Sequence, residues 1–222
     1  MAAVPAEQET ARARLKISEI FFSIQGEALF SGWPTVFVRL TGCPLRCQYC
    51  DTSYAFTGGE WRSFAEIERE VRRFGTPHVC VTGGEPLAQP RCTALLTTLC
   101  DAGLQVSLET SGAIDISDVD PRVARVLDVK TPGSNEVERN RWQNLDVLTP
   151  HDAVKIVICD RGDFEWARTL LAARSFPCPV FFSPSHEQLP AGTLADWILE
   201  DHLPVRLQVQ LHKVLWGDVK GR

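Results

Sequence analysis

The sequence has no long hydrophobic run and no excess of basic residues. No stretch approaches 18 consecutive apolar residues, so we expect no transmembrane helix and no membrane partner. The first 14 residues lack the apolar segment of a secretory signal, which indicates a cytoplasmic protein. Lys and Arg number 23 against 28 Asp and Glu, and the resulting net charge of −5 argues against a nucleic-acid partner.

Internal repeats, low-complexity tracts and Gly/Ser-rich linkers are also absent from the 222 residues. This length suits one domain, and it is enough to bury a core without the help of a disulfide or a metal. We therefore expect a flexible N-terminal extension over residues 1–14 and a single domain over residues 15–222.

Short apolar or β-branched runs alternate with helical patterns along the chain. The predicted strands are Ile17–Ile24, Thr35–Leu40, His78–Val81, Gln105–Leu108, Val123–Leu127, Val154–Ile158, Pro179–Phe182 and Val205–Gln208. The predicted helices span 64–74, 87–101, 162–174 and 194–201. This alternation predicts an α/β fold with a mostly parallel sheet covered by helices. A complete eight-unit barrel typically needs about 250 residues, so the length favours a short or incomplete barrel.

Several of the predicted helices carry start or stop signals. Ser63 followed by Glu66 forms a capping-box pattern at the first helix. Gly103 stands just after the second helix, where a glycine commonly ends a helix. Asp160 and Thr193 are the predicted N-caps of the last two helices.

Eight cysteines are the unusual feature of the composition. An even number suggests a disulfide framework, but such frameworks belong to small secreted domains. In a reducing cytosol, clustered cysteines more often serve metal binding or catalysis. Five of the eight stand in apolar strand or helix contexts and are predicted to be small core side chains. These five are Cys80, Cys92, Cys100, Cys159 and Cys178.

The other three cysteines, Cys43, Cys47 and Cys50, lie in one loop directly after a predicted strand. Their C-x₃-C-x₂-C spacing places three soft thiolates together, which iron–sulfur clusters and zinc both prefer. A structural zinc site needs four protein ligands, and no fourth Cys or His stands nearby in the sequence. Three ligands on a cubane cluster would instead leave one iron open for a ligand. A zinc loop completed from a distant residue remains the alternative.

The cysteine loop, with Tyr49 before its last cysteine, resembles the signature of the radical S-adenosylmethionine superfamily. Thr82-Gly83-Gly84-Glu85-Pro86 is similar to the GGEP motif of that superfamily. The resemblance implies a [4Fe-4S] cluster that binds S-adenosylmethionine and, on reduction by an external donor such as flavodoxin or ferredoxin, generates a 5′-deoxyadenosyl radical. It also implies a modified, incomplete (β/α) barrel of the radical S-adenosylmethionine type.

Segments on both sides of the loop resemble the 7-carboxy-7-deazaguanine synthase family over residues 16–216, nearly the whole chain. They are Ile20–Glu27, Val36–Cys43, Glu109–Gly112, Asp128–Pro132 and Gln208–Lys213. The resemblance implies a homodimeric lyase with Mg²⁺. Its reaction is the ring contraction of 6-carboxy-5,6,7,8-tetrahydropterin to 7-carboxy-7-deazaguanine with release of ammonia, in queuosine and deazapurine biosynthesis. No protein side chain is assigned as a catalytic acid or base.

The same resemblance assigns roles to individual residues. The cluster ligands are Cys43, Cys47 and Cys50, and the Mg²⁺ ligand is Thr52. The substrate contacts are Ile24, Gln25, Gly26, Glu27, Arg39 and Thr82. The cofactor contacts are Tyr49, Cys50, Asp51, Gly84, Glu109, Asp128, Lys130 and Ser183. For Arg39 an ion-paired structural role is the alternative, and His212 is equally consistent with a structural histidine. Because ten residues follow His212, no substrate role is assigned to the terminus.

Two other functions share parts of this pattern. A glycyl-radical activating enzyme has a similar size and the same cysteine loop, but it acts on a partner protein. A non-catalytic, zinc-stabilised binding module would hold one zinc and no iron.

Overall fold

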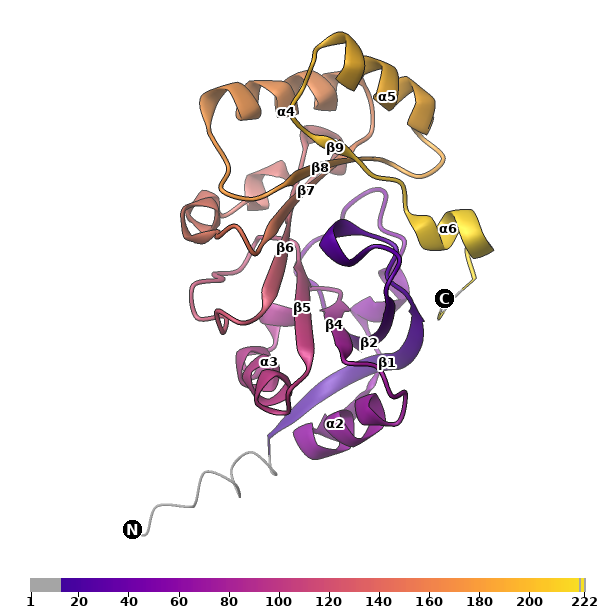
Figure 1. The fold of residues 1–222 in the computed structure, drawn as a ribbon, viewed down its shortest axis with the longest axis vertical. Coiled ribbons are helices and arrows are strands. Elements are labelled where there is room, and N and C mark those ends of the chain that lie inside the picture. Colours follow the sequence, from indigo (N-terminus) through magenta and orange to yellow (C-terminus); the bar gives the residue numbers. More distant parts are fainter. Residues whose placement is uncertain (1–12, 220, 222) are drawn as a thin grey trace.

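The computed structural model describes residues 13–219 and 221, and these form a single nine-stranded sheet flanked by helices (Figure 1). The strand order is β3-β1-β2-β4-β5-β6-β7-β8-β9. The strands are β1 (Arg14–Ile24), β2 (Pro34–Leu40), β3 (Glu60–Ser63), β4 (His78–Gly83), β5 (Gln105–Thr110), β6 (Ala124–Val129), β7 (Ala153–Ile158), β8 (Val180–Pro184) and β9 (Arg206–Leu207). The predicted extension over 1–14 lies almost entirely outside the described residues, and β1 begins at its end.

The strands from β2 to β9 are parallel to one another, and β1 runs antiparallel to both of its neighbours, β2 and β3. Because β3 and β9 end the strand order without pairing to each other, the sheet stays open. The predicted α/β class, the mostly parallel sheet and the incomplete barrel are therefore confirmed. Parallel neighbours place their carboxyl ends at one edge of the sheet, where the loops of functional sites gather.

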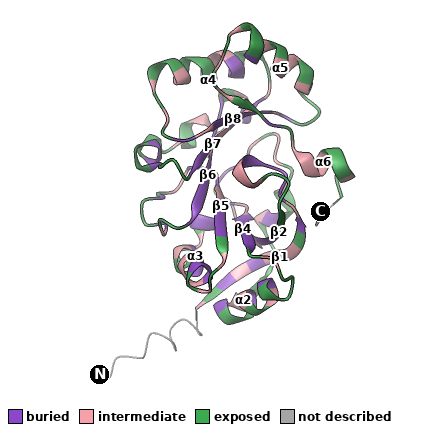
Figure 2. Ribbon diagram, viewed as in Figure 1, coloured by how far each residue is buried: buried purple, intermediate pink, exposed green. Residues whose placement is uncertain are grey.

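Four helices, α2 to α5, cover one face of the sheet and bury the main hydrophobic core against it (Figure 2). Leu95, Leu96 and Leu99 of α3 are fully buried, and burial of each leucine contributes about 2 kcal/mol. The helices are α2 (Phe64–Arg72), α3 (Cys92–Asp101), α4 (Arg161–Ala173), α5 (Ala191–Glu200) and α6 (Leu211–Trp216). The short 3-10 turns are η1 (Ala28–Phe30), η2 (Ser53–Phe56), η3 (Pro86–Ala88), η4 (Pro132–Ser134), η5 (Val137–Arg139) and η6 (Trp142–Val147).

Three of the four predicted helix signals are confirmed. Ser63 and Glu66 form the reciprocal capping box of α2, and the Asp160 carboxylate accepts a hydrogen bond from Asp163 N at the start of α4. Gly103 follows α3 with φ of +80°, a conformation that glycine adopts without strain. The predicted Thr193 cap is wrong. Helix α5 begins directly after Pro190, so Thr193 already lies in its first turn.

The helix predicted over 87–101 is confirmed only over Cys92–Asp101. Proline disfavours helical geometry at the residue before it, and Gln89 before Pro90 is extended, with φ of −93° and ψ of 111°. The segment therefore divides into η3 and α3. The sequence analysis also did not predict β3 or α6, which are short and carry too few buried residues to show a period.

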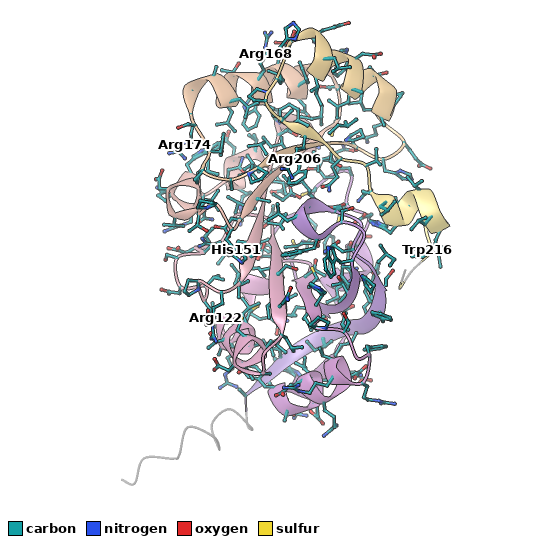
Figure 3. All side chains as sticks on the ribbon, in the orientation of Figure 1. Arg122, His151, Arg168, Arg174, Arg206 and Trp216 are labelled. Atoms are coloured by element: carbon teal, nitrogen blue, oxygen red, sulfur yellow. The ribbon has the colours of Figure 1, made fainter. Side chains whose placement is uncertain are left out.

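Several charged side chains on the outer surface form ion pairs, among them Arg168 and Arg122, which are labelled in Figure 3. Arg168 contacts Glu165 and Asp201 at the top of the molecule, and Arg122 contacts Asp101 and Asp120 beside α3. Exposed pairs of this kind stabilise a fold by less than about 1 kcal/mol each.

Candidate functional site

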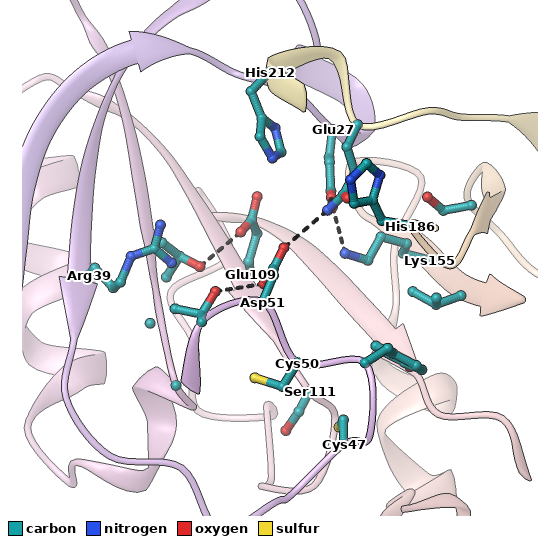
Figure 4. Close-up of a pocket in the computed structure, with 18 of the residues that line it drawn as sticks. Glu27, Arg39, Cys47, Cys50, Asp51, Glu109, Ser111, Lys155, His186 and His212 are labelled. Atoms are coloured by element: carbon teal, nitrogen blue, oxygen red, sulfur yellow. Dashed lines mark hydrogen bonds and ion pairs between the residues drawn. The ribbon is translucent and has the colours of Figure 1, made fainter. Parts of the chain in front are cut away.

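A pocket with a volume of about 250 Å³ opens at the carboxyl ends of the parallel strands (Figure 4). Residues from the cysteine loop, from the ends of β2, β4 and β5, and from the segment before α6 line it. All predicted site residues line this pocket except Gly26 and Asp128. Motifs that lie far apart in the sequence are thus brought to one place, as the predicted strand ends required.

The inner face of the sheet explains how the polar groups reach the pocket. Side chains alternate between the two faces of a strand, so polar residues of β2, β4, β5, β6 and β7 can lie on the face opposite to the main core. These residues are Arg39, Thr82, Glu109, Asp128 and Lys155. Register places Arg39 beside Thr82, and Asp128 beside Lys155. Thr82 donates a hydrogen bond to Glu109 Oε2 at 2.8 Å. A row of polar side chains therefore crosses five neighbouring strands.

The three thiols of the cysteine loop line the pocket but are not gathered around one point. Among the described residues, the metal-ligating atoms found within 4.8 Å of one another belong to His186, Glu187 and Asp218, which are all exposed. Thiolates on one tetrahedral zinc ion would lie about 3.8 Å apart, given Zn–S bonds of about 2.3 Å, and the three thiols of the loop are not all within 4.8 Å of one another.

Burial and a lysine act in opposite directions on these thiols. Burial is the larger effect and raises the pKa of Cys43, Cys47 and Cys50, and the Lys130 ammonium offsets only part of this rise. Lys130 is itself buried and pairs with Asp128 Oδ2 at 3.0 Å. A fixed cation beside the loop favours the thiolate forms that an iron–sulfur cluster needs.

Glu85 connects its own loop after β4 to the loop after β5 and to the start of the cysteine loop. Its fully buried carboxylate accepts hydrogen bonds from Leu87 N at 3.0 Å, from Ser111 N at 2.7 Å and from the Thr110 hydroxyl at 3.0 Å. Its own backbone N–H donates to Gly42 O, at the start of the cysteine loop, at 2.8 Å. The GGEP segment therefore fixes the cysteine loop relative to the end of β5.

Glu109, at the end of β5, is the centre of a hydrogen-bonded group in the pocket. Gln25 Nε2 donates to Glu109 Oε1 at 3.3 Å, and Gln25 Oε1 accepts from Glu27 N at 3.2 Å. Thr82 occupies the other oxygen of Glu109. Three of the predicted substrate residues, Gln25, Glu27 and Thr82, thus form one connected group with Glu109, which was predicted as a cofactor contact.

Arg39 is ion-paired and also faces the pocket. Its Nε lies 2.6 Å from Glu19 Oε1, and its guanidinium lies 5.5 Å from the ring centroid of Phe21. Burial alone would lower the pKa of Arg39, but Tyr54 and Glu19 raise it, so the guanidinium stays charged. One edge of the guanidinium is held by Glu19. The other nitrogens have no hydrogen bond among the contacts of the described residues and can bind an anionic ligand.

Thr52 and Asp51 form the outer end of the cysteine loop. The Thr52 hydroxyl donates to Asp51 Oδ1 at 2.8 Å, and both residues line the pocket. Gly26, in contrast, lies against the final helix, where a Cβ would come within 2.1 Å of His212 Nδ1. Gly26 therefore allows His212 to approach the pocket, in which His212 is a lining residue.

The sequence analysis missed Lys155, Gln210 and Lys213, all of which line the pocket. Lys155 Nζ lies 2.5 Å from Glu27 Oε2, and Gln210 Nε2 donates to Glu27 Oε1 at 2.7 Å. A lysine in the otherwise apolar strand Ala153–Ile158 was the available signal. A charge at such a position is rarely buried without a partner.

The residues present fit a polar cofactor beside the cysteine loop. Tyr49 lines the pocket, and its buried hydroxyl has no hydrogen-bond partner within the part of the chain that the structure describes. Its ring lies 5.8 Å from Lys130 Nζ. Ser183 at the end of β8 lines the same side. A ligand with both charged and hydrogen-bonding groups would satisfy these side chains, which belong to the predicted cofactor set.

The remaining five cysteines differ from one another. Four of them, Cys80, Cys92, Cys100 and Cys178, are buried as predicted. The core prediction is wrong for Cys159, which is half-buried after the end of β7 and lies 3.6 Å from Gln48 Nε2. Its pKa is raised to about 12 by burial and by Asp163. It therefore contacts the cysteine loop through Gln48 and is not one of the residues that line the pocket.

None of the helices in the described part of the chain has the length and apolar character needed to cross a membrane.

Comparison with known proteins places these features in a family. The sequence profile of the Radical SAM superfamily matches residues 37–183, more than half of the chain. The 7-carboxy-7-deazaguanine synthase of Chlorobaculum tepidum is 44% identical over 94% of this chain and 98% of its own length. The synthase of Koribacter versatilis is 41% identical over 93% of this chain and 100% of its own.

Solved structures agree with the fold. QueE from Escherichia coli superposes with a TM-score of 0.73 at 23% identity, covering 95% of this chain and 100% of that one. SuiB from Streptococcus suis, in a structure bound to S-adenosylmethionine, superposes with a TM-score of 0.54 at 11% identity over 76% of this chain and 45% of that one. From the sequence relationships, the chain belongs to the 7-carboxy-7-deazaguanine synthase family of the radical S-adenosylmethionine superfamily.

Proposed function

We propose that this protein converts 6-carboxy-5,6,7,8-tetrahydropterin to 7-carboxy-7-deazaguanine with release of ammonia, a carbon–nitrogen lyase reaction. The observation that carries the proposal is that the predicted cofactor-binding residues and the predicted substrate-binding residues line the same pocket. The cysteine loop forms one wall, and the group around Gln25, Glu109 and Arg39 forms the other. Relatives that cover nearly the whole chain carry the synthase name.

The cofactor side of the pocket is proposed to hold a [4Fe-4S] cluster on Cys43, Cys47 and Cys50, with S-adenosylmethionine beside it. When bound and reduced, this pair supplies a carbon-centred radical that abstracts hydrogen from the substrate. Lys130 holds positive charge next to the cysteine loop, and Tyr49 offers a buried hydroxyl. Ser183 and Gly84 line the same side of the pocket.

The substrate side is proposed to bind the pterin acid. Arg39 offers a planar guanidinium suited to a carboxylate. Glu109 and Gln25 present oxygen and nitrogen atoms that can pair with the pterin ring edge. Thr52 offers a hard oxygen for Mg²⁺, which completes its coordination with water and substrate oxygen. Ile24 lines the wall between these groups and the cluster loop.

The assembly around the enzyme is part of the same proposal. We expect a homodimer in the cytoplasm, an external one-electron donor such as flavodoxin or ferredoxin, and no nucleic-acid or membrane partner. The net charge of −5 supports the expectation on nucleic acid.

An anaerobic assay tests the proposal. Protein with reconstituted cluster is incubated with the pterin acid, S-adenosylmethionine, Mg²⁺ and a reductant, and the product is identified by mass. We expect the mass of the deazaguanine acid and an equivalent of ammonia. Cys47→Ala protein treated in the same way is the control, because three cluster ligands leave none spare. Protein that holds the cluster and cleaves S-adenosylmethionine but yields no deazaguanine would refute the proposed substrate.

A further inference from the structure

Lys155 lies at the centre of the charged groups in the pocket. It is the third residue of β7, where register places it between Asp128 of β6 and Phe181 of β8. Only 15% of its side chain is exposed. Its Nζ lies 2.5 Å from Glu27 Oε2 (Figure 4). It also lies 3.6 Å from Asp128 Oδ2, so one ammonium contacts two carboxylates.

The Glu27 carboxylate is held from two directions. Lys155 takes one oxygen, and Gln210 Nε2 donates to the other at 2.7 Å. The Glu27 backbone N–H donates to Gln25 Oε1, and Gln25 Nε2 reaches Glu109. Backbone hydrogen bonds with Trp33, Gly32 and Leu211 hold the main chain of this segment, and Lys155 supplies the charged contact that holds the Glu27 side chain.

The Asp128 carboxylate connects Lys155 to the cofactor side. Asp128 Oδ2 also pairs with Lys130 at 3.0 Å, while Asp128 Oδ1 has no hydrogen-bond partner among the described residues. Lys130 retains Asp128 if Lys155 is lost, whereas Glu27 then keeps only a neutral amide. Loss of Lys155 should therefore disturb the substrate side more than the cofactor side.

The balance of charge around the pocket also indicates that loss of Lys155 would affect substrate binding. The carboxylates that attract the Lys155 ammonium from neighbouring elements are those of Glu27, Asp128 and Glu109. The charge of Lys155 in turn interacts electrostatically with Asp51, Tyr49 and Lys130. Without its ammonium, one positive charge disappears from a site with several carboxylates. A substrate that carries a carboxylate would meet stronger repulsion there.

We propose that Lys155 is a positioning residue for substrate binding, which holds Glu27 in place and balances the carboxylates that face the pterin acid. This inference rests on the proposed function. It assigns a role to a residue of β7 that lines the same pocket and contacts Glu27 of the substrate segment.

A double-mutant cycle tests the proposal. Cluster-loaded wild type, Lys155→Met, Glu27→Gln and the double variant are compared anaerobically for the dissociation constant of the pterin acid with S-adenosylmethionine present. We expect Lys155→Met to weaken substrate binding about 10- to 100-fold, as loss of one partner of a buried charge pair does. The double variant should bind about as well as the weaker single variant. Lys155→Arg should recover most of the affinity, because it keeps the charge.

Controls separate this role from a general loss of structure. Lys16→Met removes a lysine on β1 that lines no part of the pocket, and it should bind substrate as the wild type does. The dissociation constant of S-adenosylmethionine should change less than that of the pterin acid in Lys155→Met. If Lys155→Met does not hold a cluster, Glu27→Gln removes the same ion pair by changing its other partner. Glu27→Gln should then weaken binding of the pterin acid without loss of the cluster.

The outcomes distinguish the two proposals. A wild-type protein that neither binds nor converts the pterin acid would refute the proposed function. A wild type that converts it, together with Lys155→Met of unchanged affinity or a cycle with additive effects, would refute the role of Lys155 alone. An equal loss of both ligands would also count against that role, because it indicates collapse of the site.

Discussion

Gly84 lies so close to Cys43 that a Cβ on Gly84 would stand 2.8 Å from the Cys43 side chain and 2.2 Å from Gly42 O. The loop after β4 thus rests directly on the start of the cysteine loop. Gly84 N also donates to Leu40 O at 3.2 Å. Only a residue without a side chain permits this approach, so Gly84 sets the position of the first predicted cluster ligand.

Gly84→Ala should prevent normal cluster assembly. The added methyl group would overlap a backbone carbonyl, which cannot move without shifting the cysteine loop. We expect a large fall in iron and sulfide per chain after reconstitution, read from metal analysis and cluster absorbance. Gly192→Ala is the matched control, because nothing lies within 4 Å of its added Cβ. Full cluster content in Gly84→Ala would contradict the packing argument.

Glu85→Gln should destabilise the protein even before any cofactor is added. Both oxygens of the carboxylate accept hydrogen bonds from donors on two loops. In an amide, one oxygen is replaced by an NH₂ group, which is a donor and would face those donors without forming a hydrogen bond. We expect the free energy of unfolding to fall by about 2 kcal/mol or more, measured in urea. Glu165→Gln, which breaks only exposed pairs on α4, should cost less than about 1 kcal/mol. Equal effects of the two changes would show that the Glu85 contacts contribute little.

Local sequence patterns predicted most of the fold because each pattern acts within a few residues. The capping box at Ser63, the alternation along β4 to β8 and the cysteine spacing all have this range. The strand ends then implied that the Thr82 and Glu109 segments meet, and the structure brings them into contact at 2.8 Å. The prediction failed where a proline interrupts a helical pattern, since the helix predicted over 87–101 is divided at Pro90.

The partners of the pocket charges were not predictable in the same way. Lys155 and Glu27 are 128 positions apart, and Gln210 and Glu27 are 183 apart. No local period relates such residues, because sheet register and the path of the last segment bring them together. The ion pair of Arg39 with Glu19 was left open for the same reason, since register between β1 and β2 decides it.

Asp152→Asn should remove a pH-dependent part of the stability. Asp152 forms a buried two-point pair with Arg125, with distances of 2.6 and 2.9 Å. Burial alone would raise the pKa of Asp152, but the hydrogen bonds from Arg125 and Thr149 outweigh it and lower the pKa. A lowered pKa gives stability that is complete above the unfolded value, near 4, and is lost as the pH falls below it.

We expect Asp152→Asn to lower the free energy of unfolding by about 3 kcal/mol at pH 7, because it leaves Arg125 buried without a charge partner. Its unfolding free energy should also depend less on pH between about 5 and 3 than that of the wild type. Urea unfolding at several pH values measures both effects. The exposed Asp118→Asn serves as control, and equal pH slopes for wild type and Asp152→Asn would argue against this account.

Thr52→Ala should raise the Mg²⁺ concentration needed for half-maximal activity. The change removes a hard oxygen from the outer end of the cysteine loop while leaving Asp51 and the cysteines in place. Mg²⁺ titration of turnover at saturating substrate gives the comparison, and Thr52→Ser, which keeps the hydroxyl, should behave as the wild type does. Unchanged metal dependence in Thr52→Ala would remove Thr52 from the Mg²⁺ site.

Arg39→Lys should weaken binding of the pterin acid more than binding of S-adenosylmethionine. The lysine keeps the charge and can still reach Glu19, but it lacks the planar pair of N–H groups that would face a carboxylate. Loss of a two-point contact with a carboxylate corresponds to about a tenfold or larger rise in the substrate KM. Initial rates at varied pterin and varied S-adenosylmethionine separate the two effects, with the surface change Arg168→Lys as control. If Arg39→Lys raised only the KM of S-adenosylmethionine, Arg39 would belong to the cofactor side of the pocket.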